Sequence, residues 1–263
     1  MRVVSLFLLS LLGRYLINKG MRVLKIAING INGKMGLEIV KLINQDNELE
    51  LFEFKAGNLA VDVVIDFSSP IGCMEALNWC VIHKIPLVIG TTGLSIEQKT
   101  IIGNAANTIP IVLSPNMSLS VNVMFAISQL VAKYLPNAEV EIIEAHHRYK
   151  KDSPSGTAIG IGEAVASGRN QHLLDVAKFG RERQSEEPRG NQEIGFAVVR
   201  GGDIVGKHTA MFILDGEELN ITSNITDRKS FAFGAVLAAK FVVNQNQAML
   251  YTMQDFQDHR GSI

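Results

Sequence analysis

The segment EAHHRYKKDSPSGTA, residues 144–158, carries the side chains with the clearest chemical potential. His146 and His147 can transfer a proton near neutral pH, and Lys150 adds a full positive charge. A helix is predicted to begin with Ser155, Gly156 and Thr157, whose free backbone N–H groups would form an anion site. Because adjacent strand residues point to opposite faces, the two histidines should have different roles. A lone histidine is more often structural, but this combination within twelve residues favours a site for a carboxylate.

A glycine-rich turn links an apolar run at residues 23–29 to a predicted helix. Strand, glycine turn and helix in this order open a nucleotide-binding βαβ unit. The turn consists of Gly30, Ile31, Asn32, Gly33, Lys34, Met35 and Gly36. Gly30 allows the tight turn, Gly33 lets the backbone approach a diphosphate, and Gly36 lets the helix pack closely. Asn32 stands where another glycine is common, and its tolerance of left-handed backbone angles should preserve the turn.

Taken alone the turn is a weak signal, because a purely structural glycine turn looks the same, but three later segments strengthen it. Each follows a predicted strand at its carboxyl end, where ligands bind in open parallel sheets. The segments are Asp66–Ser69, then Gly90, Thr91, Thr92 and Gly93, and finally Ser114, Pro115, Asn116 and Met117. Together these turns predict a cofactor site along one edge of a sheet.

Strands and helices alternate through residues 21–117. Strands are expected at 23–29, 49–54, 61–67, 86–89 and 109–113, with helices from residue 37, at 70–83 and at 95–106. This alternation predicts a parallel sheet with right-handed crossovers, and hence an α/β fold.

The pattern changes after Asn116. A helix at 119–135, a strand at 139–145 and a helix at 155–167 are expected, followed by strands at 194–200, 206–214 and 217–225. The short connections between the last three strands favour antiparallel pairing. Residues 118–228 should therefore form an α+β substrate-binding domain with a mixed sheet. The helix at 231–244 should pack back on the dinucleotide-binding domain, which then comprises residues 21–117 and 229–263.

Composition limits the classes of function. Of 263 residues, 47% are hydrophobic and 19% are charged, which is enough apolar material for buried cores. A net charge of −1 gives no footprint for nucleic acid and no strongly cationic face for a membrane. Cys73 and Cys80 lie too far apart on one helix for a disulfide, so both are expected to be buried and reduced. No metal-ligand spacing is recognised, and we expect no metal site.

The first twenty residues are unusual. Residues 3–12 are almost entirely apolar but too few to span a bilayer as a helix, and no convincing signal-peptide cleavage site follows them. Met21 directly precedes the first predicted strand. We expect residues 1–20 to be an overextended start or a loosely attached extension outside the fold, and the remaining chain to be cytoplasmic.

Five segments together resemble the 4-hydroxy-tetrahydrodipicolinate reductase family, also called dihydrodipicolinate reductase. They are INGINGKMG, VVIDFSSP, VIGTTG, EIIEAHHRYKKDSPSGTA and IGFAVVRGGDIVGKHTAMF. The stretch around the two histidines is highly specific to the family, whereas the glycine turn is not. The resemblance implies a Rossmann-like cofactor domain and a homotetramer built by the second sheet. It also implies that NADH or NADPH reduces a ring C=C conjugated with C=N in a small dicarboxylate of lysine and diaminopimelate biosynthesis.

The resemblance also implies roles for individual residues. His146 matches the family's proton-donating histidine, and Lys150 matches its catalytic lysine. The positions that hold the substrate carboxylates match His147, Gly156 and Thr157, and we add Ser155 at the same helix start. The cofactor contacts match residues 30–35, 90–92 and 114–117.

The chain departs from the family pattern in two places. Residues 1–20 have no expected counterpart, and the segment between strand 49–54 and Val61 is short. In the family that segment carries the acidic residue that reads the adenosine ribose. Here Glu53 is the candidate for a ribose hydroxyl and Lys55 for a 2′-phosphate, so the preference between NADH and NADPH stays open.

Two other classes of function also stay open. Another dehydrogenase of a small carboxylate could use the same cofactor domain, although a semialdehyde dehydrogenase needs a cysteine nucleophile on the substrate side of the cleft. Both cysteines lie in the first domain, which disfavours that alternative. A non-catalytic NAD(P)-binding regulator would not need the combination of histidines, lysine and helix start at residues 146–157.

Overall fold

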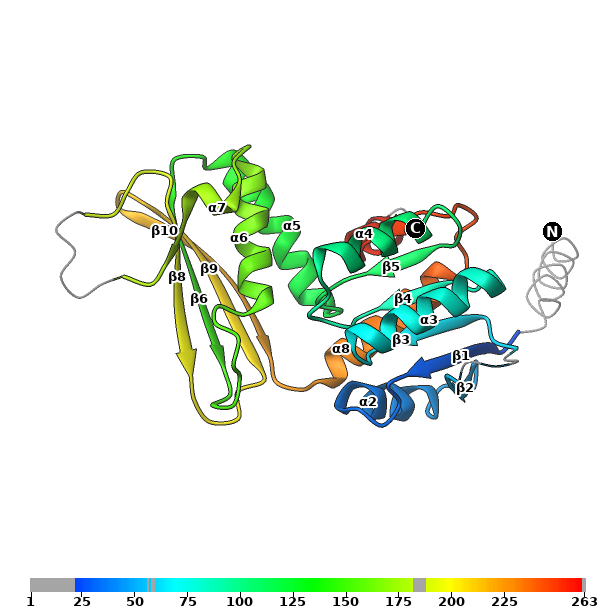
Figure 1. Ribbon diagram of the computed structural model, residues 1–263. Helices are drawn as coiled ribbons and strands as arrows, with labels where there is room; N and C mark the ends of the chain where they lie inside the picture. The colour runs from blue at the N-terminus through cyan, green and yellow to red at the C-terminus, as the bar shows by residue number, and fades with distance from the viewer. Residues whose placement is uncertain (1–21, 56, 58–59, 182–187, 262–263) are drawn as a thin grey trace, which may run out of the picture.

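The computed structural model describes residues 22–55, 57, 60–181 and 188–261. The extension expected at residues 1–20 therefore lies outside the described residues. Two β-sheets stand side by side, each with its own helices (Figure 1). The chain passes from the first sheet to the second near residue 117 and returns near residue 228, so a cleft between them can draw residues from both.

The first sheet has six strands, all parallel, in the order β11-β5-β4-β3-β1-β2. They are β1 (Leu24–Asn29), β2 (Leu49–Glu53), β3 (Val63–Asp66), β4 (Leu87–Ile89), β5 (Ile111–Leu113) and β11 (Leu250–Tyr251). The helices around this sheet are α2 (Lys34–Ile43), α3 (Pro70–His83), α4 (Ile96–Ala105), α8 (Lys229–Val242) and α9 (Met253–Gly261). One core joins the sheet to α2, α8 and α9, and a second core joins it to α3 and α4. Because helices cover both faces, β3 and β4 are wholly buried and almost wholly apolar, which confirms the predicted α/β fold.

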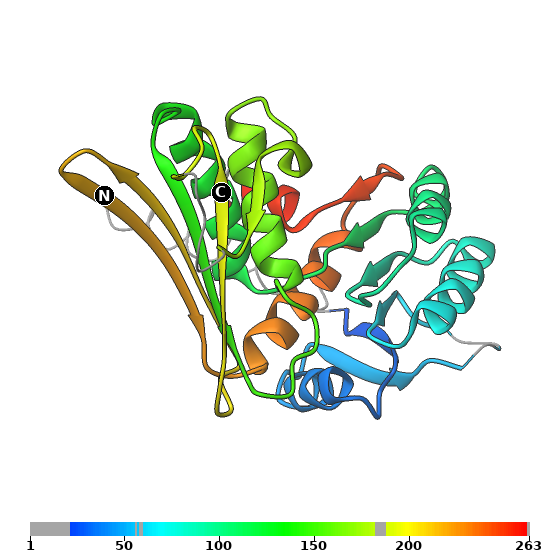
Figure 2. The ribbon, with the colours of Figure 1, turned by 60° about the vertical axis from the view of Figure 1, so that its left-hand side comes forward.

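The second sheet has five strands in the order β10-β9-β6-β8-β7. They are β6 (Glu139–His146), β7 (Ala177–Phe179), β8 (Ile194–Arg200), β9 (Gly206–Leu214) and β10 (Glu217–Ile225). The helices of this half are α5 (Leu119–Tyr134), α6 (Gly156–Gly168) and α7 (Leu173–Val176). Helices α5 and α6 cover one face, and no described element covers the other (Figures 1 and 2). The sheet is mixed, as predicted.

The strand order of this sheet corrects one expectation. Strands β8 and β9 follow each other closely in sequence, yet they do not pair. Strand β6 lies between them, parallel to β8 and antiparallel to β9. The connection crosses the end of β6, where the N–H of Gly201 donates to the carbonyl of His146 at 2.9 Å. Strand β6 takes the central position because alternate residues from Val140 to His146 are buried against the helices.

Serine hydroxyls fix the starts of three helices: α3 after Ser69, α4 after Ser95 and α6 after Ser155. Helix α2 begins at Lys34, earlier than the expected residue 37, because the glycine turn leads directly into its first turn. Four short elements were not predicted, namely α7, β7, β11 and α9. Helix α7 and strands β7 and β11 have only two to four residues each, too few for a periodic pattern to stand out, and α9 is largely polar.

Cys73 and Cys80 are free and fully buried, as expected. Burial raises the pKa of both thiols far above its usual value, so neither is a reactive thiolate. Within the described part of the chain, no helix has the length and apolar character needed to cross a bilayer. Across the same residues, no group of three or more His, Cys, Asp or Glu side chains is arranged to hold a metal ion.

Candidate active site

The turn between β1 and α2 begins with Gly30, whose φ is +84°. A Cβ atom there would lie 2.5 Å from the carbonyl oxygen of Phe67, so a side chain is excluded by both angle and space. A Cβ at Gly36 would lie 2.2 Å from the carbonyl oxygen of Gly30, which explains the close packing of α2 on the sheet. The left-handed angle expected at Asn32 was wrong, because Gly30 supplies the positive φ that the turn requires. The first turn of α2 presents free N–H groups and Lys34 at the sheet edge.

A buried aspartate joins the strand ends beside this turn. Asp66, at the end of β3, is fully buried and accepts three hydrogen bonds. The donors are Asn29 Nδ2 at 2.8 Å, Ser68 Oγ at 2.6 Å and Thr91 Oγ1 at 2.6 Å. The N–H of Ser68 also donates to Thr91 Oγ1 at 3.0 Å. The carboxyl ends of β1, β3 and β4 are therefore held by one network of neutral donors around one carboxylate.

The segment after β5 connects the two halves of the molecule. The hydroxyl of Ser114 donates to the carbonyl of Asn116 at 2.7 Å, and Asn116 Oδ1 accepts from the N–H of Ser118 at 2.9 Å. Asn116 Nδ2 then donates to Thr157 Oγ1 at 2.9 Å, in the first turn of α6. A predicted cofactor residue and a predicted substrate residue are thus in direct contact.

On the second sheet, β6 ends in a buried pair, Glu144 and His146. His146 Nδ1 lies 2.6 Å from Glu144 Oε2. Arg200, at the end of β8, donates to both oxygens of the same carboxylate at 2.7 and 2.9 Å. The N–H of Ser155 donates to Glu144 Oε1 at 2.9 Å. Glu144 opens the segment singled out in the sequence but was given no role there, and the available signal was its place two residues before His146 on an alternating strand.

Burial and charge oppose each other around this carboxylate. Burial would raise the pKa of Glu144, but hydrogen bonds from Arg200, His146 and the Ser155 N–H hold it below its usual value. Burial lowers the pKa of His146, and the contact with Glu144 offsets this only in part. Burial and the neighbouring His146 lower the pKa of His208, on β9, to about 4. Near neutral pH, Glu144 is therefore ionised and His208 is neutral.

His147 and Lys150 are placed to meet a ligand. The Nδ1 atom of His147 is buried with no hydrogen-bond partner among the described residues. Lys150 Nζ lies 2.8 Å from Asp152 Oδ2, and its side chain is 21% exposed. Ser155 instead faces inward, where its hydroxyl caps the N–H of Ala158 and lies 3.1 Å from Nε2 of His208. The backbone of the α6 start, rather than the Ser155 side chain, is therefore the available donor.

A cleft of about 570 Å³ brings the two sets of residues together. Thirteen of the predicted site residues line it: Gly33, Lys34, Met35, Gly90, Thr91, Thr92, Pro115, Asn116, Met117, His146, His147, Lys150 and Thr157. The predicted residues outside its lining are Gly30, Ile31, Asn32, Glu53, Ser114, Ser155 and Gly156. The other lining residues are Phe67 and Ser68, which lie in the predicted turn at residues 66–69, and Val205, Arg228 and Phe231, which were not predicted. Of these, Arg228 could have been identified from the sequence, because it is a cation at the point where the chain returns to the first sheet.

The lining of this cleft is positively charged. It contains Lys34, Lys150 and Arg228, and no Asp or Glu is among its described lining residues. Such a surface favours anions, including diphosphate and carboxylate groups.

A larger cavity, of about 700 Å³, lies at the amino ends of β1 and β2. Two of its three cations, Arg22 and Lys240, are already paired, with Asp62 and Asp46 respectively. It also lies at the opposite end of the strands from the glycine turn, where ligands are not expected in a parallel sheet. We therefore assign the chemistry to the smaller cleft.

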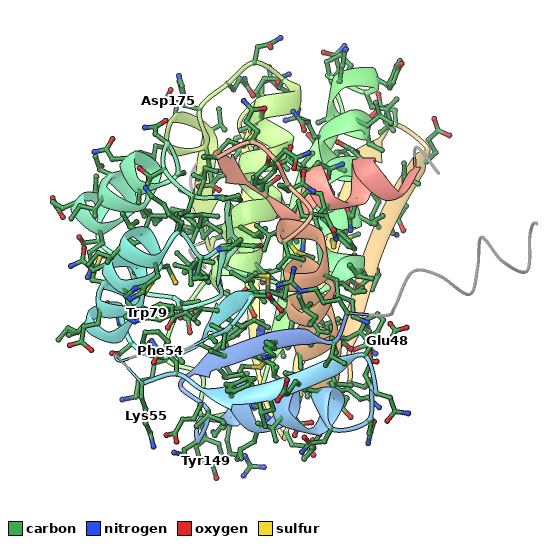
Figure 3. All side chains as sticks on the ribbon, turned by 90° about the vertical axis from the view of Figure 1, so that its right-hand side faces the viewer. Glu48, Phe54, Lys55, Trp79, Tyr149 and Asp175 are labelled. Carbon is green, nitrogen blue, oxygen red and sulfur yellow. The ribbon has the colours of Figure 1, made fainter. Side chains whose placement is uncertain are left out.

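Glu53 and Lys55 stand at the carboxyl end of β2, outside the lining of the cleft. Lys55 Nζ lies 2.8 Å from Glu53 Oε2, with side chains 73% and 44% exposed respectively. Lys55 projects at the outer edge of the first sheet, next to Phe54 (Figure 3). The ring of Phe54 packs edge-on against Trp79 with 5.5 Å between centroids, which anchors the strand end beneath them. Both charged residues remain candidates for the adenosine end of a cofactor.

Comparison with known proteins agrees with this geometry. Family models described as dihydrodipicolinate reductase match in two parts, the N-terminus at residues 24–58 and 51–117 and the C-terminus at residues 120–256. The 4-hydroxy-tetrahydrodipicolinate reductase of Nitrosomonas europaea is 42% identical over 88% of this chain and 97% of its own length. That of Colwellia psychrerythraea is 41% identical over the same shares.

Solved structures share the fold. A dipicolinate-bound dihydrodipicolinate reductase from Paenisporosarcina sp. TG-14 superposes with a TM-score of 0.70 at 24% identity, covering 88% of this chain and 97% of the other. A myo-inositol dehydrogenase from Corynebacterium glutamicum has a TM-score of 0.54 at 15% identity, covering 89% and 92%. These two likenesses support a Rossmann-like fold, whereas the sequence relatives are close enough to define the family. The chain belongs to the dihydrodipicolinate reductase family, whose members are 4-hydroxy-tetrahydrodipicolinate reductases using NADH or NADPH.

Proposed function

We propose that the cleft between the two sheets is where this chain reduces 4-hydroxy-tetrahydrodipicolinate to tetrahydrodipicolinate, a step of diaminopimelate and lysine biosynthesis. One observation carries the proposal. Turns at the carboxyl ends of the first sheet face His146, Lys150 and the start of α6 across one cleft, and Asn116 bonds directly to Thr157. Hydride transfer needs cofactor and substrate sites in such contact.

The first sheet supplies the cofactor side. The glycine turn leaves no room for side chains at Gly30 and Gly36, and it delivers the free N–H groups of α2 together with Lys34. This arrangement fits a dinucleotide diphosphate. When bound, a reduced nicotinamide supplies the hydride. Gly90, Thr91 and Thr92, with Ser114, Pro115, Asn116 and Met117, would hold its other end.

The second sheet supplies the substrate side. Lys150, the Nδ1 atom of His147, which has no partner in the described part of the chain, and the backbone N–H groups of Gly156 and Thr157 would bind the two carboxylates. The dipicolinate bound to the Paenisporosarcina relative is a small aromatic dicarboxylate of this kind. His146 would deliver the proton that completes the addition. Lys150, a cation four residues further along the chain that lines the same cleft, would assist this proton transfer.

An absorbance assay tests the proposal. NADH or NADPH is mixed with the purified chain, with and without freshly prepared dihydrodipicolinate precursor. Loss of the nicotinamide absorbance should require both protein and precursor. A chain that binds cofactor but never oxidises it with the precursor would instead be a regulator, and turnover only with another carboxylate would identify a different dehydrogenase.

The finer assignments belong to the same proposal. Residues 21–117 and 229–263 would form the dinucleotide-binding domain and residues 118–228 the substrate domain. The enzyme would be a cytoplasmic homotetramer. In support, the face of the second sheet without helices exposes Ile143 and Val199 beside charged side chains. Light scattering should give four times the chain mass, and a monomer would contradict the assembly.

A further inference from the structure

Glu144 is a buried carboxylate that lies next to the cleft without lining it. We propose that Glu144 is a positioning residue, which fixes the proton of His146 on Nδ1 and ties the first turn of α6 to strand β6. A single side chain would then orient both the proton donor and the helix start that receives a substrate carboxylate. The inference rests on the proposed function for what His146 and α6 do, but not for how Glu144 holds them.

The geometry leaves Glu144 no role other than acceptor. Its side chain is 1% exposed, and each oxygen has two partners. Oε2 lies 2.6 Å from His146 Nδ1 and 2.7 Å from Arg200. Oε1 lies 2.9 Å from the N–H of Ser155 and 2.9 Å from Arg200. A carboxylate bound bidentately by a guanidinium is ionised and has no proton to give.

The identity of the acceptor determines the tautomer of the histidine. Because Glu144 can only accept, Nδ1 of His146 must carry the hydrogen that lies between them. The remaining ring nitrogen, Nε2, is then the one available to the cleft that His146 lines. A proton reaching Nε2 gives an imidazolium, whose charge Glu144 stabilises at 2.6 Å.

Other groups facing His146 act against that charge. Lys150 on the following loop and Arg200 on β8 repel a proton on the ring, and burial also disfavours it. His208 on β9 packs edge-on with 5.0 Å between ring centroids and is itself neutral near pH 7. Glu144 thus stabilises an imidazolium that burial and the neighbouring cations disfavour. Loss of the Glu144 charge should therefore lower the pKa of His146 further.

The same carboxylate reaches the substrate-binding helix. The N–H of Ser155 donates to Oε1 of Glu144, and the Ser155 hydroxyl caps α6 through the N–H of Ala158. Arg200 reinforces the arrangement, since it also donates to the carbonyl of Asp152 at 2.7 Å. The loop that carries Lys150 and the start of α6 are therefore held against β6 through one ion pair.

Glu144→Gln separates the two parts of the proposal. Its amide oxygen can still accept from Ser155, but its NH₂ group faces His146 without negative charge. We expect kcat at pH 7 to fall by about tenfold or more, and the alkaline limb of the kcat profile to move about one unit lower in pH. KM should change by less than about threefold, because the α6 start is retained. Cofactor affinity should be unchanged.

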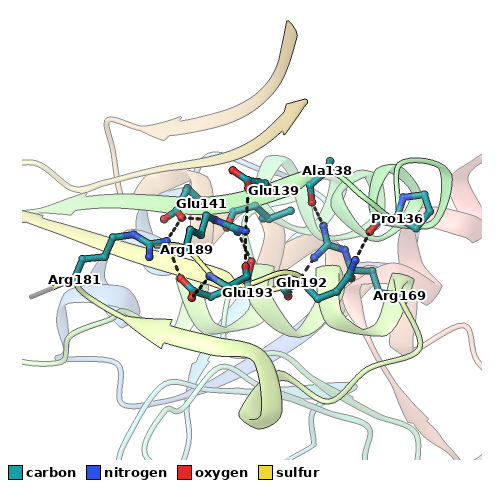
Figure 4. A network of polar contacts seen from close by, with 11 residues as sticks. Pro136, Ala138, Glu139, Glu141, Arg169, Arg181, Arg189, Gln192 and Glu193 are labelled. Atoms are coloured by element: carbon teal, nitrogen blue, oxygen red, sulfur yellow. Dashed lines mark hydrogen bonds and ion pairs between the residues drawn. The ribbon is translucent and has the colours of Figure 1, made fainter. Parts of the chain in front are cut away.

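Glu141→Gln is the matched control. Glu141 stands on the same strand but faces the other side, where it pairs with Arg181 at 2.5 Å and Arg189 at 3.2 Å (Figure 4). The substitution removes a carboxylate from arginines without touching His146, so the pH profile should not move. An equal shift in both variants, or a Glu144→Gln profile identical to that of the unchanged enzyme, would overturn the proposal. Light scattering on each variant keeps altered assembly from being mistaken for altered chemistry.

A second measurement determines the tautomer of His146 in the unchanged enzyme. Nitrogen-15 NMR of the histidine rings, with His146→Gln to assign the resonance, reports which ring nitrogen carries hydrogen. We expect His146 to be protonated at Nδ1 when neutral, and protonation at Nε2 alone would overturn the proposal. If the unchanged chain never turned over the precursor, the proposed function would fail, while this measurement would still decide the role of Glu144.

Discussion

Two buried carboxylates lie at strand ends on the two sides of the cleft, and their partners differ. Asp66 ends β3 in the first sheet and accepts from the neutral side chains Asn29, Ser68 and Thr91. Glu144 lies near the end of β6 in the second sheet and accepts from Arg200, His146 and a backbone N–H. The first network holds loops together, whereas the second includes an imidazole, His146, that can carry a proton.

The difference matches the function of each side of the cleft. The cofactor side must hold turns in place around a large ligand, for which hydroxyl and amide donors are sufficient. The substrate side must also control a proton, and this requires charges whose balance sets a pKa. We therefore expect substitutions near Glu144 to change catalysis and its pH dependence. Substitutions near Asp66 should change stability and cofactor affinity.

The largest effect is expected at Lys150. Lys150→Ala removes a charge that serves both binding of a dianion and the reaction, so kcat should fall roughly 100-fold and KM should rise roughly tenfold. Steady-state kinetics measure both. Lys151→Ala, which removes an exposed neighbouring lysine, is the control and should change neither by more than about twofold. A rise in KM alone would make Lys150 a binding residue only.

His146→Gln should follow, with kcat lowered about 100-fold and KM nearly unchanged. The reason is that a proton donor acts in the transition state. The adjacent His147→Gln should show the reverse, a raised KM with little change in kcat, because His147 would contact a carboxylate. If His146→Gln raised KM alone, the assignment of His146 as proton donor would be wrong. Cofactor titration should give the same affinity for both variants.

His208, on the substrate side of the cleft, should make the stability of the protein depend on pH. Folding lowers its pKa from the usual 6.5 to about 4, so the unfolded chain binds this proton first as pH falls. Stability is therefore lost from about pH 6.5 downwards, by about 2 kcal/mol between pH 7 and pH 5. His208→Gln should flatten this part of a plot of Tm against pH. His172→Gln, at an exposed histidine, should leave the slope as it is.

Asp66→Asn tests the other side of the comparison. An asparagine has one acceptor oxygen, so at least one of the donors Ser68 and Thr91 must turn or lose its partner. We expect a loss of about 1–2 kcal/mol in the free energy of unfolding and a weaker cofactor affinity, with the pH profile of kcat unmoved. Asp62→Asn, at the amino end of the same sheet, should cost stability but leave cofactor affinity alone. A displaced pH profile in Asp66→Asn would remove the distinction between the two carboxylates.

Sequence predicted the first sheet more fully than the second. The central strands β3 and β4 are buried on both faces, and the strands of the first sheet alternate with helices, so apolar runs and turns were enough to predict a parallel sheet. In the second sheet the order of strands depends on which strand is central. The short joint between β8 and β9 suggested a pairing that β6 prevents. Two strands that are close in sequence need not pair, because a third strand can lie between them.

The candidate site shows the same limit. Residues in a local motif, such as His146, His147 and Lys150, could be chosen from sequence because their chemistry lies within a few positions. Arg200 and His208 come from β8 and β9, and only the strand order brings them to Glu144. Arg228 reaches the cleft because the chain returns there to the first sheet. Arg200 and His208, which depend on strand pairing, carry no local signal.

The smallest effect concerns the cofactor. Glu53 would bind a ribose hydroxyl and Lys55 a 2′-phosphate, yet the two pair with each other at 2.8 Å and both are largely solvated. We therefore expect NADH and NADPH both to be used, with a preference below about 100-fold, or roughly 2.7 kcal/mol. Lys55→Ala should weaken use of NADPH a few-fold, and this loss should shrink as salt is raised, because an exposed charge is screened. Glu53→Ala should weaken use of NADH alone. Steady-state kcat/KM with each cofactor at low and high salt measures all of these effects, and a preference above 100-fold that survives both substitutions would place cofactor selection elsewhere in the cleft.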